Sequence, residues 1–415
     1  MNVHRIASIV FILAGLAAAG CRAAQTPASV EERARALHRR ILTVDTHCDT
    51  AFNLLRTDWK IGDRHDPSLR TSGKIDLPRM KEGGLDAEFF AAFVGQGPRT
   101  PDGYAKAKDG AVKIIDAIWQ MTRDYPDLIG LALEPRDAYR LKRQGKLAAF
   151  IGIENGYTVG LDASLVGFYY GKGVRYITLC HSADNDICDS STDRQNPEDK
   201  GLSDFGRKVV EECNKVGVLV DISHASDKSF YDVLAASRAP IIASHSSSRA
   251  VCDNPRNLSD DQIKALAKKG GVIQICFLGA YVKKPAPNPE RDKAMKELEE
   301  KYGNRRDIKD DALRLKAMEE FRALNDKFPQ DRPTVKDLVD HIDHIKKIVG
   351  IDYVGIGTDF DGGGGVLGCD DVSGMIHVTE ELIRRGYTDK EIEKIWGGNF
   401  MRVFNKVKDL AKAAS

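Results

Sequence analysis

The chain has 415 residues, in which 62 Lys and Arg nearly balance 61 Asp and Glu, so its formal net charge is +1. A nearly neutral chain gives no argument for nucleic acid as a partner. The length fits one large domain, and after the first 20 residues no apolar run approaches the roughly 20 residues that a membrane-spanning helix needs.

The first 21 residues follow the order of a secretory signal peptide. A short basic start precedes an apolar run over residues 6–19, and small residues then lead to Cys21. The segment Ala18-Ala19-Gly20-Cys21 resembles the end of a bacterial lipoprotein signal, in which the cysteine is lipidated and becomes the new N-terminus. We therefore expect export to the bacterial cell envelope, with contact to the membrane only through a lipid on Cys21. The alternative is an ordinary cleaved signal with an incidental cysteine.

Residues 22–35 are predicted to form a tether, and residues 36–408 a single domain. Apolar, β-prone runs alternate with helical patterns along this domain, which favours an α/β fold with a parallel sheet and predicts a (β/α)8, TIM-type barrel. The predicted buried strands are Ile41–His47, Ala87–Val94, Ala148–Ile153, Arg175–Cys180, Val218–Ser223, Pro240–Ser244, Val272–Phe277 and Tyr353–Gly357. The strongly charged residues 284–333 are poor in β-branched residues and predict a helical insertion between strands seven and eight.

Histidines and carboxylates stand at the carboxyl ends of six of these strands. They are His47 and Asp49 on the first strand, then Glu154, His181, His224, His245 and Asp359. Each alone is more simply a strand-end or capping residue, but in a closed barrel these ends form one rim, where barrel enzymes place their catalytic groups. Side chains two apart on a strand share a face, so His47 and Asp49 can reach one ion together. Imidazole and carboxylate suit zinc or a similar divalent ion, and we predict a shared metal site.

The number of these groups indicates the chemistry. Four histidines and three carboxylates exceed what one tetrahedral zinc uses, so two metal ions sharing a bridging carboxylate account for them better. A water between two cations loses a proton near neutral pH, and one metal polarises a carbonyl oxygen. A further carboxylate, held off the metals, can carry the proton to a leaving amine. Together these groups could carry out the metal-assisted hydrolysis of an amide.

In combination, these motifs resemble the membrane (renal-type) dipeptidases, a branch of the amidohydrolase superfamily with a (β/α)8 barrel and two zinc ions. The resemblance extends from about Ile41 to Phe404. It rests on Asp-x-His-x-Asp at His47, the glycine-flanked Glu154, Ser-His-x-Ser at His224, Ser-His-Ser-Ser at His245, Arg256-Asn257, Gly-x-Asp-Phe-Asp-Gly at Asp359 and Gly-Gly-Asn-Phe at Asn399.

The resemblance implies a role for each of these residues. His47 and Asp49 would hold one zinc ion, His224 and His245 the other, and Glu154 would bridge the two. His181 would contact the substrate carbonyl and stabilise the tetrahedral oxyanion. Asp359 would be the proton shuttle, although alternation places Asp361 on the same face and the sequence leaves the two open. Arg256 would pair with the terminal carboxylate of the substrate, and Tyr281 falls where the family has a substrate-contacting tyrosine.

The substrate implied by the resemblance is a free dipeptide, including one with a C-terminal D-residue, and the family also implies a homodimer. One alternative is another binuclear amidohydrolase, acting on N-acyl amino acids or lactones. Many such barrels bridge their metals with a modified lysine on strand four, whereas here that strand ends in His181 without a lysine and Glu154 can bridge. The other alternative is a metal-binding lipoprotein without catalysis. Asp359, His181 and Arg256, which metal storage does not need, argue against it.

Overall fold

The computed structural model describes residues 29–413, except 194, 196, 197, 304–307, 309 and 330. The predicted signal peptide with Cys21, and the tether up to residue 28, lie outside the described residues. Eight strands pair in parallel in the order β1-β2-β4-β5-β6-β7-β8-β9. Their bounds are β1 (Val44–Cys48), β2 (Ala87–Phe93), β4 (Leu147–Glu154), β5 (Val174–Thr178), β6 (Leu219–Asp221), β7 (Ile242–Ser246), β8 (Val272–Ile275) and β9 (Val354–Ile356).

The sheet closes between its first and last strands. Cys48 forms a parallel bridge to Phe360, just beyond β9. Two backbone bonds reinforce it, from Asp49 N to Phe360 O (2.8 Å) and from Asp359 N to His47 O (3.0 Å). The predicted α/β barrel of eight parallel strands is thereby confirmed, and closure sets residues from both ends of the sequence side by side.

One described strand does not appear in the sequence prediction. The strand β3 (Ile129–Leu131) pairs with the first residues of β4, from Leu147 to Ala149, and lies off the path of the barrel. Its three residues are too few to show the periodicity by which strands are recognised.

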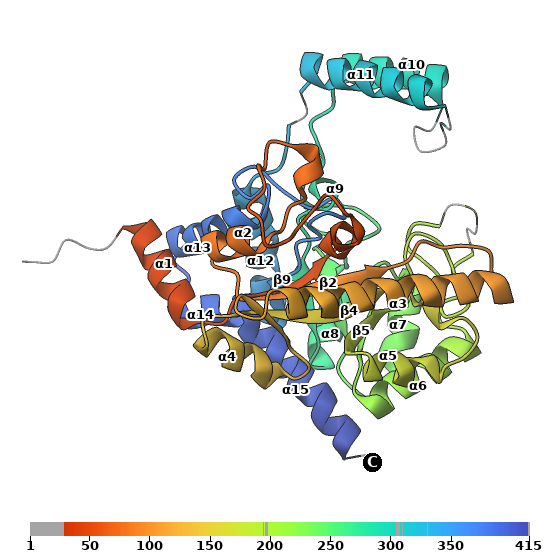
Figure 1. Cartoon of the computed structure of the whole chain (residues 1–415), viewed down its shortest axis with the longest axis vertical. Helices are drawn as coiled ribbons and strands as arrows, with labels where there is room; N and C mark the ends of the chain where they lie inside the picture. Colours follow the sequence, from red (N-terminus) through yellow and green to blue (C-terminus); the bar gives the residue numbers. More distant parts are fainter. Residues whose placement is uncertain are drawn as a thin grey trace, which may run out of the picture.

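Helices cover the outside of the barrel (Figure 1). Their bounds are α2 (Leu77–Gly83), α3 (Pro101–Asp124), α4 (Pro135–Arg143), α5 (Leu165–Gly171), α6 (Asp204–Val216), α7 (Asp227–Ala236), α8 (Asp260–Lys268), α9 (Gly279–Val282), α12 (Val335–Val349), α13 (Met375–Arg384), α14 (Asp389–Glu393) and α15 (Asn399–Lys412). Apolar faces anchor them: on α12, for example, Leu338, Ile342 and Ile345 are fully buried. No helix in the described part of the chain is long and apolar enough to span a bilayer.

The domain begins and ends outside the predicted limits. Helix α1 (Val30–Arg40) starts within the predicted tether, where Ser29 and Glu32 form a capping box, and Ala34 and Leu37 are buried. At the other end, α15 continues to Lys412. The boundaries at 35/36 and 408 are therefore wrong, because two amphipathic terminal helices pack on the barrel.

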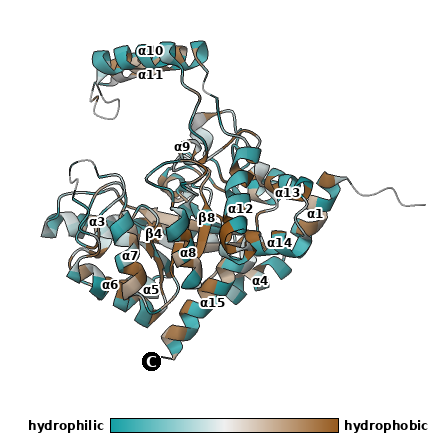
Figure 2. Cartoon of the chain, turned by 180° about the vertical axis from the view of Figure 1, so that it is seen from behind, coloured by the Kyte–Doolittle hydropathy of each residue, from teal (hydrophilic) through white to brown (hydrophobic). Residues whose placement is uncertain are grey.

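The charged segment forms the predicted helical insertion. Helices α10 (Pro289–Tyr302) and α11 (Asp311–Lys327) lie between β8 and β9, the seventh and eighth strands of the barrel, and pack on each other through Tyr302, Ala317 and Phe321. They stand away from the barrel in Figure 1, and Figure 2 shows them largely hydrophilic, in contrast to the apolar strands.

Candidate active site

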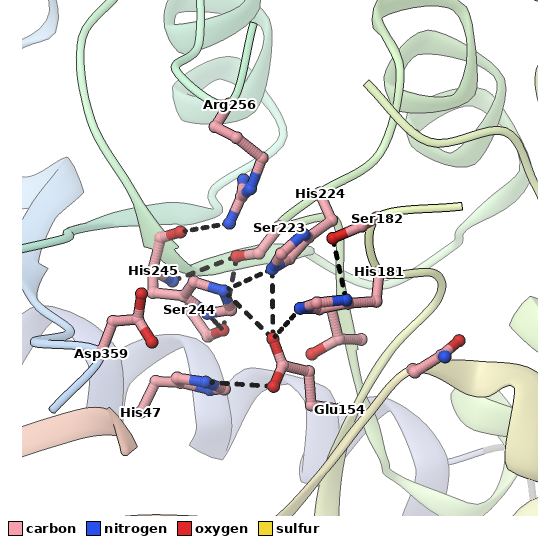
Figure 3. Close-up of polar contacts among 12 residues, drawn as sticks. His47, Glu154, His181, Ser182, Ser223, His224, Ser244, His245, Arg256 and Asp359 are labelled. Atoms are coloured by element: carbon pink, nitrogen blue, oxygen red, sulfur yellow. Dashed lines mark hydrogen bonds and ion pairs between the residues drawn. The ribbon is translucent and has the colours of Figure 1, made fainter. Parts of the chain in front are cut away.

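The structure gathers the predicted residues at the carboxyl ends of the strands (Figure 3). His47, Glu154 and His245 lie within β1, β4 and β7, whereas the others follow the ends of their strands. All are buried except His181, whose side chain is 27% exposed. The cluster is therefore largely shielded from solvent, and His181 is its most exposed side chain.

Glu154 stands at the centre of the histidines. Its Oε1 lies 3.1 Å from Nε2 of His224, 3.4 Å from Nε2 of His245 and 3.7 Å from Nε2 of His181. Its other oxygen, Oε2, lies 3.6 Å from Nε2 of His47. Each oxygen of the carboxylate thus faces a different set of imidazoles (Figure 3), which is the arrangement that a bridging ligand needs.

Three groups of side chains place their ligand atoms within 4.8 Å of one another. The groups are His47, Glu154 and His245; Glu154, His181 and His224; and His47, Asp49 and Asp359. Within the described chain, Nε2 of His47 and Oδ1 of Asp49 are buried without a hydrogen-bond partner. Since buried polar atoms are nearly always paired, these atoms fit a cation, and the donor set suits zinc and related divalent ions.

Burial and charge shift the pKa values in this cluster in opposite directions. Burial lowers the pKa of His224 and His245 well below the ordinary value, so both imidazoles are neutral and offer a lone pair. Burial acts likewise on His47, but attraction to the Glu154 and Asp49 carboxylates overcomes it and raises the pKa of His47 to about 10. Burial raises the pKa of Asp359 to about 7, with His47 opposing the shift and Glu154 adding to it.

A buried carboxylate, Asp221 at the end of β6, holds two of the histidine-bearing segments in place. It accepts hydrogen bonds from the backbone N–H and hydroxyl groups of Ser223 (3.0 and 2.9 Å) and Ser244 (2.8 and 2.6 Å), and from the Thr178 hydroxyl (2.5 Å). Since the Ser244 hydroxyl donates to Asp221, it can only accept from Nδ1 of His245, 2.9 Å away. This contact fixes the tautomer in which Nε2 of His245, 2.9 Å from Nε2 of His224, carries the lone pair that a metal ligand needs.

A second carboxylate, Asp45 on β1, acts in the same way where the barrel closes. It accepts from the backbone N–H (2.8 Å) and hydroxyl (2.5 Å) of Thr358, and from the backbone N–H of His47 (3.3 Å). Sequence reasoning missed Asp45 and Asp221 as site residues. The available signal was an aspartate inside an apolar run, two or three residues before a predicted ligand.

The backbone is strained at several residues of the site. His224, Asp359 and Asp361 have φ of +71°, +60° and +66°, in the left-handed region that ordinary residues avoid. Beside them, a Cβ on Gly362 would lie 2.0 Å from Oδ1 of Asp359 and 2.1 Å from Oδ2 of Asp49. Only glycine allows the chain to pass this closely behind the two carboxylates.

The structure separates the two aspartates that the sequence left open. Asp359 belongs to the ligand-atom group with His47 and Asp49. Asp361 instead accepts hydrogen bonds from the Thr50 hydroxyl (2.5 Å) and from Lys74 N (2.9 Å). Asp361 therefore supports the adjoining loop, and Asp359 faces the cluster.

Arg256 and Tyr281 lie together beside the cluster. The Arg256 side chain is buried, its Nη2 donates to the carbonyl oxygen of His245 (3.3 Å), and its guanidinium lies 5.2 Å from the centre of the Tyr281 ring. Its Nε has no hydrogen-bond partner among the described residues. A buried cation with an unused donor, next to a group of candidate metal ligands, suits the recognition of a carboxylate.

Comparison with known proteins gives the family context of this arrangement. The family model described as membrane dipeptidase (peptidase family M19) matches residues 31–415. Dipeptidase tcpJ of Claviceps purpurea is 31% identical over 360 residues, which are 85% of this chain and 74% of that protein. The crystal structure of the probable dipeptidase PvdM from Pseudomonas aeruginosa superposes with a TM-score of 0.79 at 33% identity, covering 93% of this chain and 100% of that one. A metallopeptidase from Rhodobacter sphaeroides, at 23% identity and a TM-score of 0.69 over 88% of this chain and 99% of that one, shares the fold.

Proposed function

Because this chain belongs to the membrane dipeptidase family, peptidase family M19, whose members are metal-dependent hydrolases, we propose that it uses two zinc ions to hydrolyse free dipeptides. His47 and Asp49 would hold one ion, His224 and His245 the other, with Glu154 between them. The central position of Glu154, with its two oxygens toward different histidines, carries this proposal. Zinc there would supply the charge that polarises an amide carbonyl and acidifies a water.

The remaining residues of the site would act on the dipeptide itself. Asp359 takes a proton from the attacking water and delivers it to the departing amine, for which a pKa of about 7 suits its carboxyl. His181, the most exposed of these histidines, contacts the carbonyl oxygen as negative charge develops there. Arg256 pairs with the C-terminal carboxylate and so fixes which bond lies before Glu154 and Asp359.

A panel of dipeptides tests the proposed function. The panel contains free dipeptides with L- or D-residues at the C-terminus, together with their N-acetylated forms, and is assayed with zinc-loaded and chelator-treated protein. We expect zinc-dependent cleavage of the free dipeptides alone. Cleavage of only the acetylated forms would instead identify a deacylase, and metal binding without any cleavage would identify a non-catalytic metal protein.

Arg256→Ala is expected to raise KM for free dipeptides by about 30-fold, because a buried charge pair with the substrate is lost. The bound metal should be retained, since Arg256 bonds to the backbone carbonyl oxygen of His245 and not to the Nε2 that would hold the metal. Arg249→Ala is a control in the same loop. Arg249 is 24% exposed, pairs with Asp227 (2.6 Å) and donates from Nε to the carbonyl oxygen of Asn257 (2.9 Å). Because neither contact reaches the histidines or carboxylates of the site, KM should change little. An unaltered KM in Arg256→Ala would contradict the proposed carboxylate contact.

We also propose that the protein is exported and held at the cell envelope by a lipid on Cys21. The order of basic, apolar and small residues before Cys21 supports this location. We expect the intact protein to incorporate labelled palmitate and the Cys21→Ala variant to lose this label. Equal labelling of both proteins would exclude Cys21 as the attachment site.

A further inference from the structure

A cavity of about 680 Å3 lies at the amino-terminal ends of the barrel strands. Its lining includes Leu42 and Asp86, which come just before β1 and β2, and Leu147, the first residue of β4. The metal cluster lies at the other ends of the same strands. From Leu147 to Glu154 the eight residues of β4 span roughly 23 Å, so the cavity is separate from the candidate active site.

Cationic side chains dominate the lining of this cavity. Seven lysines and arginines and three carboxylates contribute to it, a net charge of +4. The whole chain carries a net charge of only +1, so the concentration of positive charge here does not reflect a generally basic protein. The cations come from α1, α2, α4 and the turn before β4, and Figure 1 shows α1 and α4 at one edge of the molecule, remote from the α10–α11 insertion.

Four of the seven cations are not neutralised. Arg39, Lys81, Arg143 and Lys146 form no ion pair with any residue in the described part of the chain. The other three are paired: Arg35 with Glu31, Arg40 with Asp389, and Lys142 with Asp86. Converging like charges repel one another, and an anion in the cavity would relieve that repulsion.

The carboxylates of the lining do not supply that anion. Asp86 is held by Lys142 (2.6 Å), and Glu82 is held by Arg64 through two contacts of 2.7 and 3.0 Å. Among the described lining residues, Glu393 is the one carboxylate without a cationic partner. Four unpaired cations therefore face one unpaired carboxylate.

The floor of the cavity is apolar. Leu42, Leu85, Leu147 and Ile376 are all at most 5% exposed and line it from below, and the Tyr139 ring, 40% exposed, stands at its side. A concave site with an apolar floor and a cationic rim suits an organic anion rather than a bare halide. Arginine and lysine together suit phosphate, which offers several acceptor oxygens to the guanidinium fork and to the ammonium groups.

We propose that this cavity binds a phosphate-bearing anion, a phospholipid headgroup or a soluble phosphate, through Arg39, Lys81, Arg143 and Lys146. The proposal is independent of the function proposed for the metal cluster, because the two sites lie at opposite ends of the barrel.

The test uses the full chain and a charge-reversed variant, Arg143→Glu with Lys146→Glu. The matched control is Arg207→Glu with Lys208→Glu, which reverses two exposed cations of α6 that do not line the cavity. Inorganic phosphate is titrated by calorimetry, and sedimentation is measured with vesicles of phosphatidylcholine alone or with roughly equal phosphatidylglycerol. Circular dichroism checks the fold, and Arg143→Gln with Lys146→Gln replaces the cavity variant if the latter does not fold.

We expect the cavity variant to lose at least about 25-fold in affinity for one of these probes, whereas the control variant binds as the unaltered protein does. If the cavity variant loses phosphate binding, and neither the unaltered protein nor any variant prefers vesicles with phosphatidylglycerol, the ligand is a soluble phosphate. Loss of the preference for phosphatidylglycerol vesicles identifies a lipid headgroup. Equal behaviour of the cavity and control variants with both probes would overturn the proposal.

Discussion

Asp359→Asn is expected to lower kcat for free dipeptides about a thousandfold while the bound metal is retained. The amide has the shape of the carboxylate but cannot take up a proton and release it. Burial raises the pKa of the Asp359 carboxyl to about 7; His47 opposes this shift and Glu154 adds to it. A pKa near neutral suits a group that must both accept a proton and give it up. Steady-state kinetics and elemental analysis of the metal content measure the two parts of this prediction.

Asp361→Asn is the matched control for Asp359→Asn. It makes the same chemical change two residues away, at a residue with nearly the same backbone conformation (φ +66° against +60°). Because Asp361 bonds to Thr50 and Lys74 instead of facing the histidines, turnover should change little. Full activity of Asp359→Asn, or an equal loss in both variants, would refute Asp359 as the proton shuttle.

Asp221→Ala is expected to lower the free energy of unfolding by about 4 kcal/mol. The substitution removes the acceptor of five hydrogen bonds and leaves the donors of Ser223, Ser244 and Thr178 buried without it. It also releases the Ser244 hydroxyl that orients His245, so metal affinity should fall about 10- to 100-fold.

Thermal unfolding and titration with zinc measure these two effects of Asp221→Ala. The control is Asp116→Ala, which removes an aspartate that is 58% exposed and pairs with Lys172 on the surface. Its effect should stay within about 0.5 kcal/mol. Unfolding of Asp221→Ala at the same temperature as the control, with zinc affinity intact, would show that Asp221 does not position His245.

The barrel and the gathering of histidines and carboxylates at one end of it could be predicted from the sequence because both depend on local patterns. A buried parallel strand appears as a short apolar run, and barrel geometry then dictates that the residues after each run meet. The same local pattern hid Asp45 and Asp221, since nothing in an apolar run says which neighbouring strands will present N–H and hydroxyl groups to an aspartate. The hydrogen-bond partners of these aspartates are set by the closure of the barrel and the register of its strands, which bring together residues up to 313 positions apart.

The errors at the ends of the domain and at β3 have a different origin. The first turns of α1 are largely charged, so residues 30–35 look like a polar tether until α13 supplies the surface on which Ala34 is buried. The strand β3 depends on pairing with β4 instead of on its own three residues. Likewise, Asp359 and Asp361 share a pattern in the sequence, and only the fold of the glycine-rich loop turns one toward the histidines.

The left-handed backbone at His224 and Asp359 has a consequence for how this protein can evolve. Each such residue costs about 1–3 kcal/mol, from a total that for most domains is about 5–15 kcal/mol. A catalyst built on strained positions leaves its scaffold less able to absorb further destabilising substitutions, including those that would reshape the substrate pocket. Substitutions that change substrate specificity are therefore best tolerated in loops that contain none of the strained residues. Elsewhere they are best tolerated in variants that have already gained stability from other substitutions.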